Sequence, residues 1–348
     1  MSMSRCSPIG IEVGARTIGA VQLTSASSRV VAAAVVARRP AAEGQGQFDA
    51  QEASRVESIL YRQGFIGHDI VLCVPDGRLL TAVLELPPRS SGAPLEQLAR
   101  VELARTHKKD ACSFEMACWD LPAPARAGDG THLMAAACMH EDANGLIDIF
   151  ESAGFRVRIL DIKPWALTRA CSPVLDTAGT TALLDVGETG AMLTAVRSRV
   201  PVYERLMRDA GLGVLRARLQ RELGLEPDVA DYLLEALAGP PRTEDDSGAR
   251  ESAARMLAEH LERLAQEVGT ALDYIEHRYP GQVQLLGIMG AGAAAPGLVQ
   301  RLSRGAEFPV RLLAPSDLAA CPDFLACCGD PGLTGALGLA MAQARRAA

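Results

Sequence analysis

The chain has 348 residues, 48% hydrophobic and 22% charged, a balance typical of a globular protein with room for two ordinary domains. A formal net charge of −7 and an aromatic content of 4% argue against non-specific nucleic-acid binding, which depends on neutralising phosphates and stacking bases. The longest apolar run, Val30–Ala37, is too short to cross a bilayer, and no signal peptide is visible. Nine cysteines without a CxxC pair indicate reduced thiols, so we expect a cytoplasmic protein.

The N-terminal stretch predicts a β-meander. Residues 8–14 form a short apolar strand that ends in an acid, a spacer and a glycine, and Ile18–Leu23 and Val30–Ala37 follow as further strands. Asp49 is placed to cap the helix that comes next, and a buried strand is expected over 69–75.

The following ~80 residues change character and predict a compact α+β unit. Proline pairs and glycines mark the ends of its elements. We expect strands at Leu79–Leu86, Phe114–Leu121, His132–Met139 and Phe155–Leu160, and helices at about 94–106 and 141–153.

The second half of the chain begins by repeating the first. Thr181–Gly187 is again an apolar strand that ends in an acid, a spacer and a glycine, and Gly187 follows Gly14 by 173 residues. A repeat at half the chain length predicts two related domains that face each other. Ala191–Arg197 and Val200–Leu206 complete the repeated meander.

The remaining elements include the clearest helix of the chain, over about 249–278, whose leucines recur at spacings of three and four and predict a buried stripe. The other expected elements are helices near 213–223 and 228–238, an exposed loop at 240–248, a strand at Val283–Met289, a glycine turn at 290–292, a helix at 296–304 opened by proline, a strand at 310–313 and a final helix at 333–345.

Three strands run into glycine-bearing turns, and these turns are the candidate sites for phosphate and metal binding. Glycine lets backbone N–H groups approach a phosphate, and a carboxylate two positions earlier can hold Mg²⁺ through water. Glu12 and Asp185 are the two carboxylates, although Asp185 is equally suited to capping a turn. The third turn, before a helix, suits a nucleoside.

These turns and several whole stretches resemble the PilM-type type IV pilus assembly proteins of the actin-like ATPase superfamily, which are related to the bacterial cell-division actin homologue. The resemblance covers nearly the whole chain in the right order. The matching stretches are IGIEVGARTIGAVQL, VLCVPDGRLLTAVLELPP, FESAGFRVRILDIKPWALTRA, ALLDVGETGAMLTAV, LLGIMGAGAAAPGLVQRL and DPGLTGALGLAMA.

The resemblance implies an α/β fold with two actin-like (duplicated RNase H-like) lobes and an inserted α+β (SHS2-like) subdomain in the first lobe. It places lobe 1 at 1–76 and 162–177, the inserted subdomain at 77–161 and lobe 2 at 178–348, with a small helical subdomain at about 207–250.

The resemblance also implies ATP with Mg²⁺ as the cofactor, with Glu12 and Asp185 near the metal. Several family positions depart from the pattern: Glu12 stands where aspartate is usual, and Glu188 would lie beside the phosphates. We therefore expect a retained cleft with weakened or lost nucleotide binding. The residues assigned to the nucleotide are Glu12, Gly14, Ala15, Arg16, Thr17, Asp185, Gly187, Glu188, Thr189, Gly190, Gly290, Ala291 and Gly292.

The family binds the short cytoplasmic N-terminal segment of a PilN-type inner-membrane protein, in a groove between the first lobe and the inserted subdomain. The resemblance thus implies an assembly factor of a type IV pilus or a related secretion or DNA-uptake machine, peripheral at the inner membrane through its partner. We expect the groove to be lined by 79–86, 95–101 and 155–165, and assign partner contacts to Leu80, Ala82, Leu84, Leu98 and Val101.

Three other functions fit the same fold. One is an active ATPase or small-molecule kinase, although no residue can be named as a hydrolytic base and the turn substitutions indicate a weak ATPase at most. Another is a polymer-forming cell-division or cell-shape actin. The third is the cytoplasmic part of a type II secretion platform protein.

Overall fold

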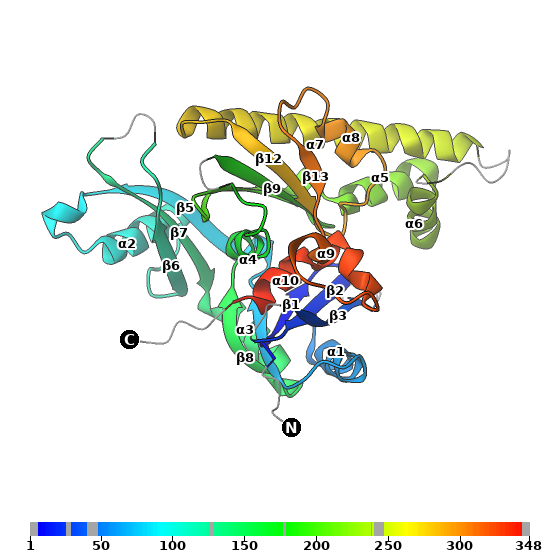
Figure 1. Ribbon diagram of the computed structural model, residues 1–348, viewed down its shortest axis with the longest axis horizontal. Helices are drawn as coiled ribbons and strands as arrows, with labels where there is room; N and C mark the ends of the chain where they lie inside the picture. Colours follow the sequence, from blue (N-terminus) through cyan, green and yellow to red (C-terminus); the bar gives the residue numbers. More distant parts are fainter. Residues whose placement is uncertain are drawn as a thin grey trace.

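A computed structural model describes residues 6–25, 29–39, 48–124, 128–176, 179–237, 239 and 247–342. Two five-stranded sheets dominate it, and a smaller three-stranded sheet stands to one side of them (Figure 1). The strand orders of the two large sheets, β3-β2-β1-β4-β8 and β11-β10-β9-β12-β13, correspond strand for strand. The duplication predicted from the sequence is therefore a duplication of sheet topology.

In each large sheet an antiparallel meander is followed by two parallel strands. The strands of the first sheet are β1 (Ile9–Val13), β2 (Thr17–Leu23), β3 (Val30–Ala37), β4 (Asp69–Cys73) and β8 (Arg156–Asp161). The strands of the second sheet are β9 (Thr180–Val186), β10 (Ala191–Arg197), β11 (Val200–Met207), β12 (Val283–Met289) and β13 (Val310–Leu312).

The central strands β1 and β9 end in the same way. Glu12 and Asp185 are each the last residue but one of their strand, and each strand leads directly into a glycine turn. Strand β9 is buried along its whole length, as expected for a strand covered on both faces. The carboxyl ends of the two strands therefore present acidic side chains to the space between the lobes.

The third sheet has the order β5-β7-β6, with β5 (Leu79–Leu86), β7 (Thr131–Met139) and β6 (Phe114–Asp120). Phe155–Leu160, expected to close this inserted unit, instead forms β8 and pairs in parallel with β4 of the first sheet. Periodicity predicts a strand but not its neighbours, which explains the difference. We propose that the inserted unit ends with β7, and the domain boundaries stay a prediction.

Ten α-helices surround the sheets within the described residues. They are α1 (Ala50–Arg62), α2 (Leu95–His107), α3 (His140–Ser152), α4 (Lys163–Ala170), α5 (Leu212–Leu223), α6 (Pro227–Ala236), α7 (Ser247–Arg278), α8 (Leu298–Leu302), α9 (Pro315–Leu318) and α10 (Thr334–Ala340).

Helices α4 and α10 lie between the two large sheets and join the lobes (Figure 1). Small residues permit this packing. A Cβ on Gly338 would overlap the carbonyl oxygen of Ala166 in α4, and a Cβ on Gly10 would overlap the backbone of α10. One apolar cluster runs through both helices and both sheets, and it contains Val21, Leu167, Leu183, Met289, Ala336 and Leu337.

The long helix α7 packs on the second lobe with its apolar stripe buried, which confirms the expected core face. No helix among the described residues has both the length and the apolar character needed to cross a membrane. Helix α8 begins after Gly297 rather than at the proline of 296, and the last part of the predicted C-terminal helix lies outside the described residues, as does most of the predicted loop at 240–248.

Candidate functional site: the cleft between the lobes

The first two glycine turns have the same hairpin geometry and face each other across a cavity of about 700 Å³. In the first turn the Gly14 N–H donates to the Thr17 carbonyl at 2.9 Å, and in the second the Gly187 N–H donates to the Gly190 carbonyl at 2.9 Å. The amides of Ala15, Arg16, Glu188 and Thr189 have no backbone partner among the described residues. Both turns therefore keep N–H groups available for an anion.

The third predicted turn also lines this cavity. The Gly292 N–H donates to the Val186 carbonyl at 2.8 Å, which ties this turn to the end of β9. Gly290 has a φ of 93°, a conformation that favours glycine, and a Cβ there would overlap the Asp185 carboxylate. All thirteen residues assigned to the nucleotide from the sequence line this one cavity.

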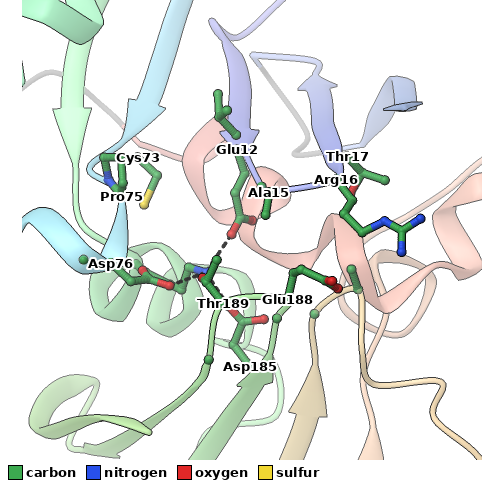
Figure 2. A pocket seen from close by; sticks show the side chains of 18 of the residues that line it. Glu12, Ala15, Arg16, Thr17, Cys73, Pro75, Asp76, Asp185, Glu188 and Thr189 are labelled. Carbon is green, nitrogen blue, oxygen red and sulfur yellow. Dashed lines mark ion pairs between the residues drawn. The ribbon is translucent and has the colours of Figure 1, made fainter. Parts of the chain in front are cut away.

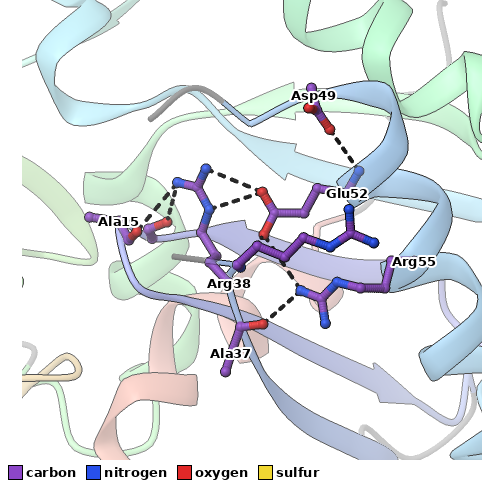
Figure 3. Close-up of polar contacts among 8 residues, drawn as sticks. Ala15, Ala37, Arg38, Asp49, Glu52 and Arg55 are labelled. Carbon is purple, nitrogen blue, oxygen red and sulfur yellow. Dashed lines mark hydrogen bonds and ion pairs between the residues drawn. The ribbon is translucent and has the colours of Figure 1, made fainter. Parts of the chain in front are cut away.

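Arg38 holds the first turn in place. Its guanidinium donates to the carbonyls of Gly14 and Ala15, at 3.2 and 3.4 Å, and pairs with the buried carboxylate of Glu52 at 3.3 Å (Figure 3). Glu52 lies in the first turn of α1, where the Asp49 side chain accepts from the Glu52 N–H at 2.8 Å as the predicted cap. The start of α1 thus fixes the position of the first glycine turn.

Three carboxylates converge at the floor of the cavity, and Figure 2 shows Glu12, Asp76 and Asp185 approaching from three sides. The ammonium of Lys163 lies between them: Nζ is 2.9 Å from Glu12 Oε1, 3.0 Å from Asp76 Oδ2 and 2.6 Å from Asp185 Oδ2. All four side chains are largely buried. Glu12 and Asp185, assigned to Mg²⁺ from the sequence, are therefore brought together around a lysine.

The backbone explains how Lys163 reaches this position. Ile162 is extended, and α4 begins at Lys163 with proline at its first turn. A cation is normally unfavourable at a helix N-terminus, where the helix dipole is positive. The three carboxylates offset that cost. Asp76 comes from the short 3₁₀ turn Asp76–Arg78, which connects β4 to the inserted unit.

The cluster changes the protonation of its members. Burial lowers the pKa of Lys163, but the carboxylates of Asp185, Asp76 and Glu12 together outweigh burial and raise that pKa well above 10.5. Burial raises the pKa of Glu12 above its ordinary value, although Lys163 opposes the shift. Burial, with Glu12 nearby, also raises the pKa of Cys73 well above 9.0, which disfavours a thiolate nucleophile there. The ammonium is therefore charged across the physiological range.

A second group of charges crosses the mouth of the cleft. Arg16 of the first turn donates twice to the Asp231 carboxylate on α6, at 2.7 and 2.5 Å. Arg216 on α5 also donates to Asp231, at 2.7 Å, and pairs with Glu188 of the second turn. Arg16 lowers the pKa of Asp231 through these hydrogen bonds. Two of the residues assigned to phosphate contacts, Arg16 and Glu188, are thus paired within the protein.

The ammonium of Lys163 occupies the place between the carboxylates where a divalent cation would bind. Mg²⁺ requires oxygen ligands at about 2.1 Å in near-octahedral geometry, but the Lys163 ammonium stands where the carboxylates meet. In the described part of the chain, no group of three or more His, Cys, Asp and Glu side chains is arranged to hold a metal ion. The cleft therefore does not fit the metal that the resemblance implies.

The model of the family described as type IV pilus assembly protein PilM matches residues 10–341. The chain belongs to this family. No curated protein sequence matches it at the significance required.

Solved structures confirm the actin-like fold of this family member. The chain is 19% identical to a chain of the "PilM-PilN type IV pilus biogenesis complex", with a TM-score of 0.78 over 96% of this chain and 97% of that one. It is 13% identical to the ethanolamine utilization protein EutJ from Carboxydothermus hydrogenoformans, with a TM-score of 0.56 over 97% and 89%. It is 15% identical to Ta0583, an archaeal actin homolog, with a TM-score of 0.50 over 96% and 98%.

The five residues assigned to the family's partner do not form one exposed surface. Leu84 is 8% exposed and lies in the apolar core between the three-stranded sheet and α2. Leu80, Ala82 and Leu98 pack against the same core, whereas Val101 on α2 is 56% exposed. A hollow of about 430 Å³ beside β5 lies toward β11 and α7 of the second lobe, and Ala82 lines it. The partner contacts stay a prediction.

Sequence reasoning did not identify several residues that shape the cleft, namely Asp76, Lys163, Asp231, Arg216 and the pair of Arg38 and Glu52. One signal was available for Lys163: it is one of three lysines in a chain with 32 arginines. A lysine offers a compact ammonium with three donors, which arginine does not. Asp231 and Arg216 lie on ordinary amphipathic helices and carry no local signal.

Proposed function

We propose that this chain is an assembly-platform protein of a type IV pilus or a related secretion or DNA-uptake machine. It binds the cytoplasmic N-terminal segment of a PilN-type inner-membrane protein and is held at the inner membrane by that partner. The observation that carries this proposal is the family match over residues 10–341. The likeness to a chain of a PilM-PilN complex over 96% of this chain supports it.

We place the peptide on the inserted unit, beside β5 and α2. Strand β5 is at an edge of its sheet, and edge strands can accept an extended peptide through backbone hydrogen bonds. Two apolar side chains of these elements are exposed, Val83 at 44% and Val101 at 56%. Exposed valines can be changed without disturbing the core, unlike Leu84.

Isothermal titration with a synthetic N-terminal peptide of the PilN-type protein from the same genome tests the proposal. We expect binding to the wild type and at least tenfold weaker binding after Val101→Asp or Val83→Asp. Val229→Asp, at a similarly exposed position on α6 of the second lobe, is the matched control and should bind normally. Absence of binding to the wild type contradicts partner capture, whereas equal binding by all variants contradicts only the surface.

We further propose that the cleft keeps the shape of a nucleotide-binding cleft but has little affinity for Mg-ATP. Lys163 at its floor and the pairing of Arg16 with Asp231 at its mouth both support this. Titration with Mg-ATP should show no binding in the micromolar range, and micromolar binding would refute the proposal.

An active ATPase or a polymer-forming actin is the alternative, and no observation favours either. Sedimentation with and without ATP separates the polymer from the scaffold. We expect the protein to stay in the supernatant in both conditions.

A further inference from the structure

The Lys163 ammonium has the surroundings of a bound cation. It carries three N–H donors, and three carboxylate oxygens lie within 2.6–3.0 Å of Nζ. The number of charged acceptors around the ammonium therefore equals its number of donors. No other Lys or Arg makes an ion pair with Glu12, Asp76 or Asp185 among the described residues.

The position of the ammonium matters as much as its partners. Glu12 ends the central strand of the first sheet, Asp185 ends the central strand of the second, and Asp76 comes from the entry to the inserted unit. A divalent ion bound by these oxygens would lie within about 3–4 Å of Nζ, a separation at which two cations repel each other strongly inside a protein. The ammonium and the metal therefore compete for one place.

We propose that Lys163 is the resident cation of the cleft: its ammonium takes the place of a divalent metal ion and joins the two lobes through Glu12 and Asp185. Any anionic ligand of this cavity is then bound without a divalent metal, by the N–H groups of the glycine turns. This inference concerns the cleft proposed above, and it does not depend on capture of the membrane partner.

Replacing Lys163 by an uncharged residue should therefore create a metal site. Mn²⁺ is the probe, because its binding is followed directly by electron paramagnetic resonance of the full-length protein without nucleotide. We expect Lys163→Met to bind one Mn²⁺ at least tenfold more tightly than the wild type. We also expect Mn²⁺ to raise its melting temperature at constant ionic strength.

Three further variants define the site. Lys163→Arg keeps a cation at the position and should behave as the wild type does. Lys109→Met removes an exposed lysine after α2 and controls for loss of one positive charge. Adding Asp185→Asn to Lys163→Met should abolish the gain, because the metal would then lose a ligand.

The possible results separate clearly. If Lys163→Met folds but binds Mn²⁺ no more tightly than the wild type, the proposal is overturned. It is also overturned if the wild type already binds Mn²⁺ as tightly as the variant and loses this binding on Asp185→Asn. If Lys163→Met folds only when Mn²⁺ is present, the proposal is supported. If it folds in neither condition, Lys163→Gln, which removes the positive charge but keeps a polar side chain and all three carboxylates, is measured in the same way, and absence of a gain there overturns the proposal.

Discussion

At the scale of single residues, buried charges in this protein are organised around the backbone of the cleft. Glu52 is buried and satisfies Arg38, and Arg38 in turn supports the carbonyls of the first glycine turn. Such a pair costs free energy to desolvate, so its loss is felt mainly when one partner is removed and the other stays buried. The position of the turn therefore depends on a carboxylate that does not line the cavity.

Glu52→Ala should lower the free energy of unfolding by about 3–5 kcal/mol, because the largely buried Arg38 then loses its counter-ion. Glu57→Ala, on the same helix but more exposed, should change stability by about 0.5 kcal/mol or less. Urea denaturation of both variants and the wild type measures the difference, and equal losses in the two variants contradict this role of Glu52.

His260 is a second buried titratable residue, on α7, whose Nε2 lies 3.2 Å from the Ala210 carbonyl oxygen. Burial lowers its pKa below 6.5, although the bond to Ala210 opposes the shift. In the unfolded chain the imidazole binds a proton near pH 6.5, whereas in the folded chain it binds one only at lower pH. The free energy of unfolding should therefore fall as the pH falls below 6.5. Urea midpoints at pH 7.5, 6.0 and 5.0 should show a weaker pH dependence in His260→Gln. Parallel profiles would argue that other groups dominate.

At the scale of elements, the two lobes are joined by helices that approach closely because glycine leaves room. In α10, a Cβ on Gly335 would overlap the Glu12 carboxylate, and a Cβ on Gly338 would overlap the Ala166 carbonyl. These glycines weaken the intrinsic helix propensity of α10. Tertiary packing on β1 and α4 thus decides that this segment is a helix.

Gly338→Ala should cost about 1–3 kcal/mol of stability, because the added methyl group has no space between α10 and α4. Gly269→Ala on α7 is the matched control: beyond the neighbouring backbone of its own helix, no atom lies within 4 Å of the added Cβ, and stability should rise by about 0.5–1 kcal/mol. Thermal unfolding of both variants distinguishes the effects, and a stabilised Gly338→Ala protein would show that the helices can separate without cost.

At the scale of the whole molecule, charged contacts close the cleft at both its floor and its mouth. The Arg16–Asp231 contact at the mouth is partly exposed, so it contributes only about 0–1 kcal/mol to stability. It nevertheless joins a turn of the first lobe to a helix of the second. A contact of this kind affects the opening of the cleft more than the stability of the fold.

Asp231→Asn should therefore leave the melting temperature nearly unchanged while increasing hydrogen exchange in the 14–17 turn and in α6. Glu235→Gln, also on α6, is the control: Glu235 makes no ion pair with the described residues of the first lobe, so this variant should exchange as the wild type does. Unchanged exchange in Asp231→Asn would show that this contact does not control the opening of the cleft.

The duplicated strand–acid–glycine hairpins and nearly all strands and helices were predictable from the residues, because hydrophobic periodicity and turn residues are local signals. The family was indicated by the resemblance of whole stretches of the chain. Three features became visible only in the folded chain: β8 joins the first sheet, Lys163 lies among Glu12, Asp76 and Asp185, and Asp231 contacts Arg16 across the cleft. These contacts join residues tens to hundreds of positions apart. Their partners are chosen by how the lobes pack, and no local pattern in the sequence encodes that choice.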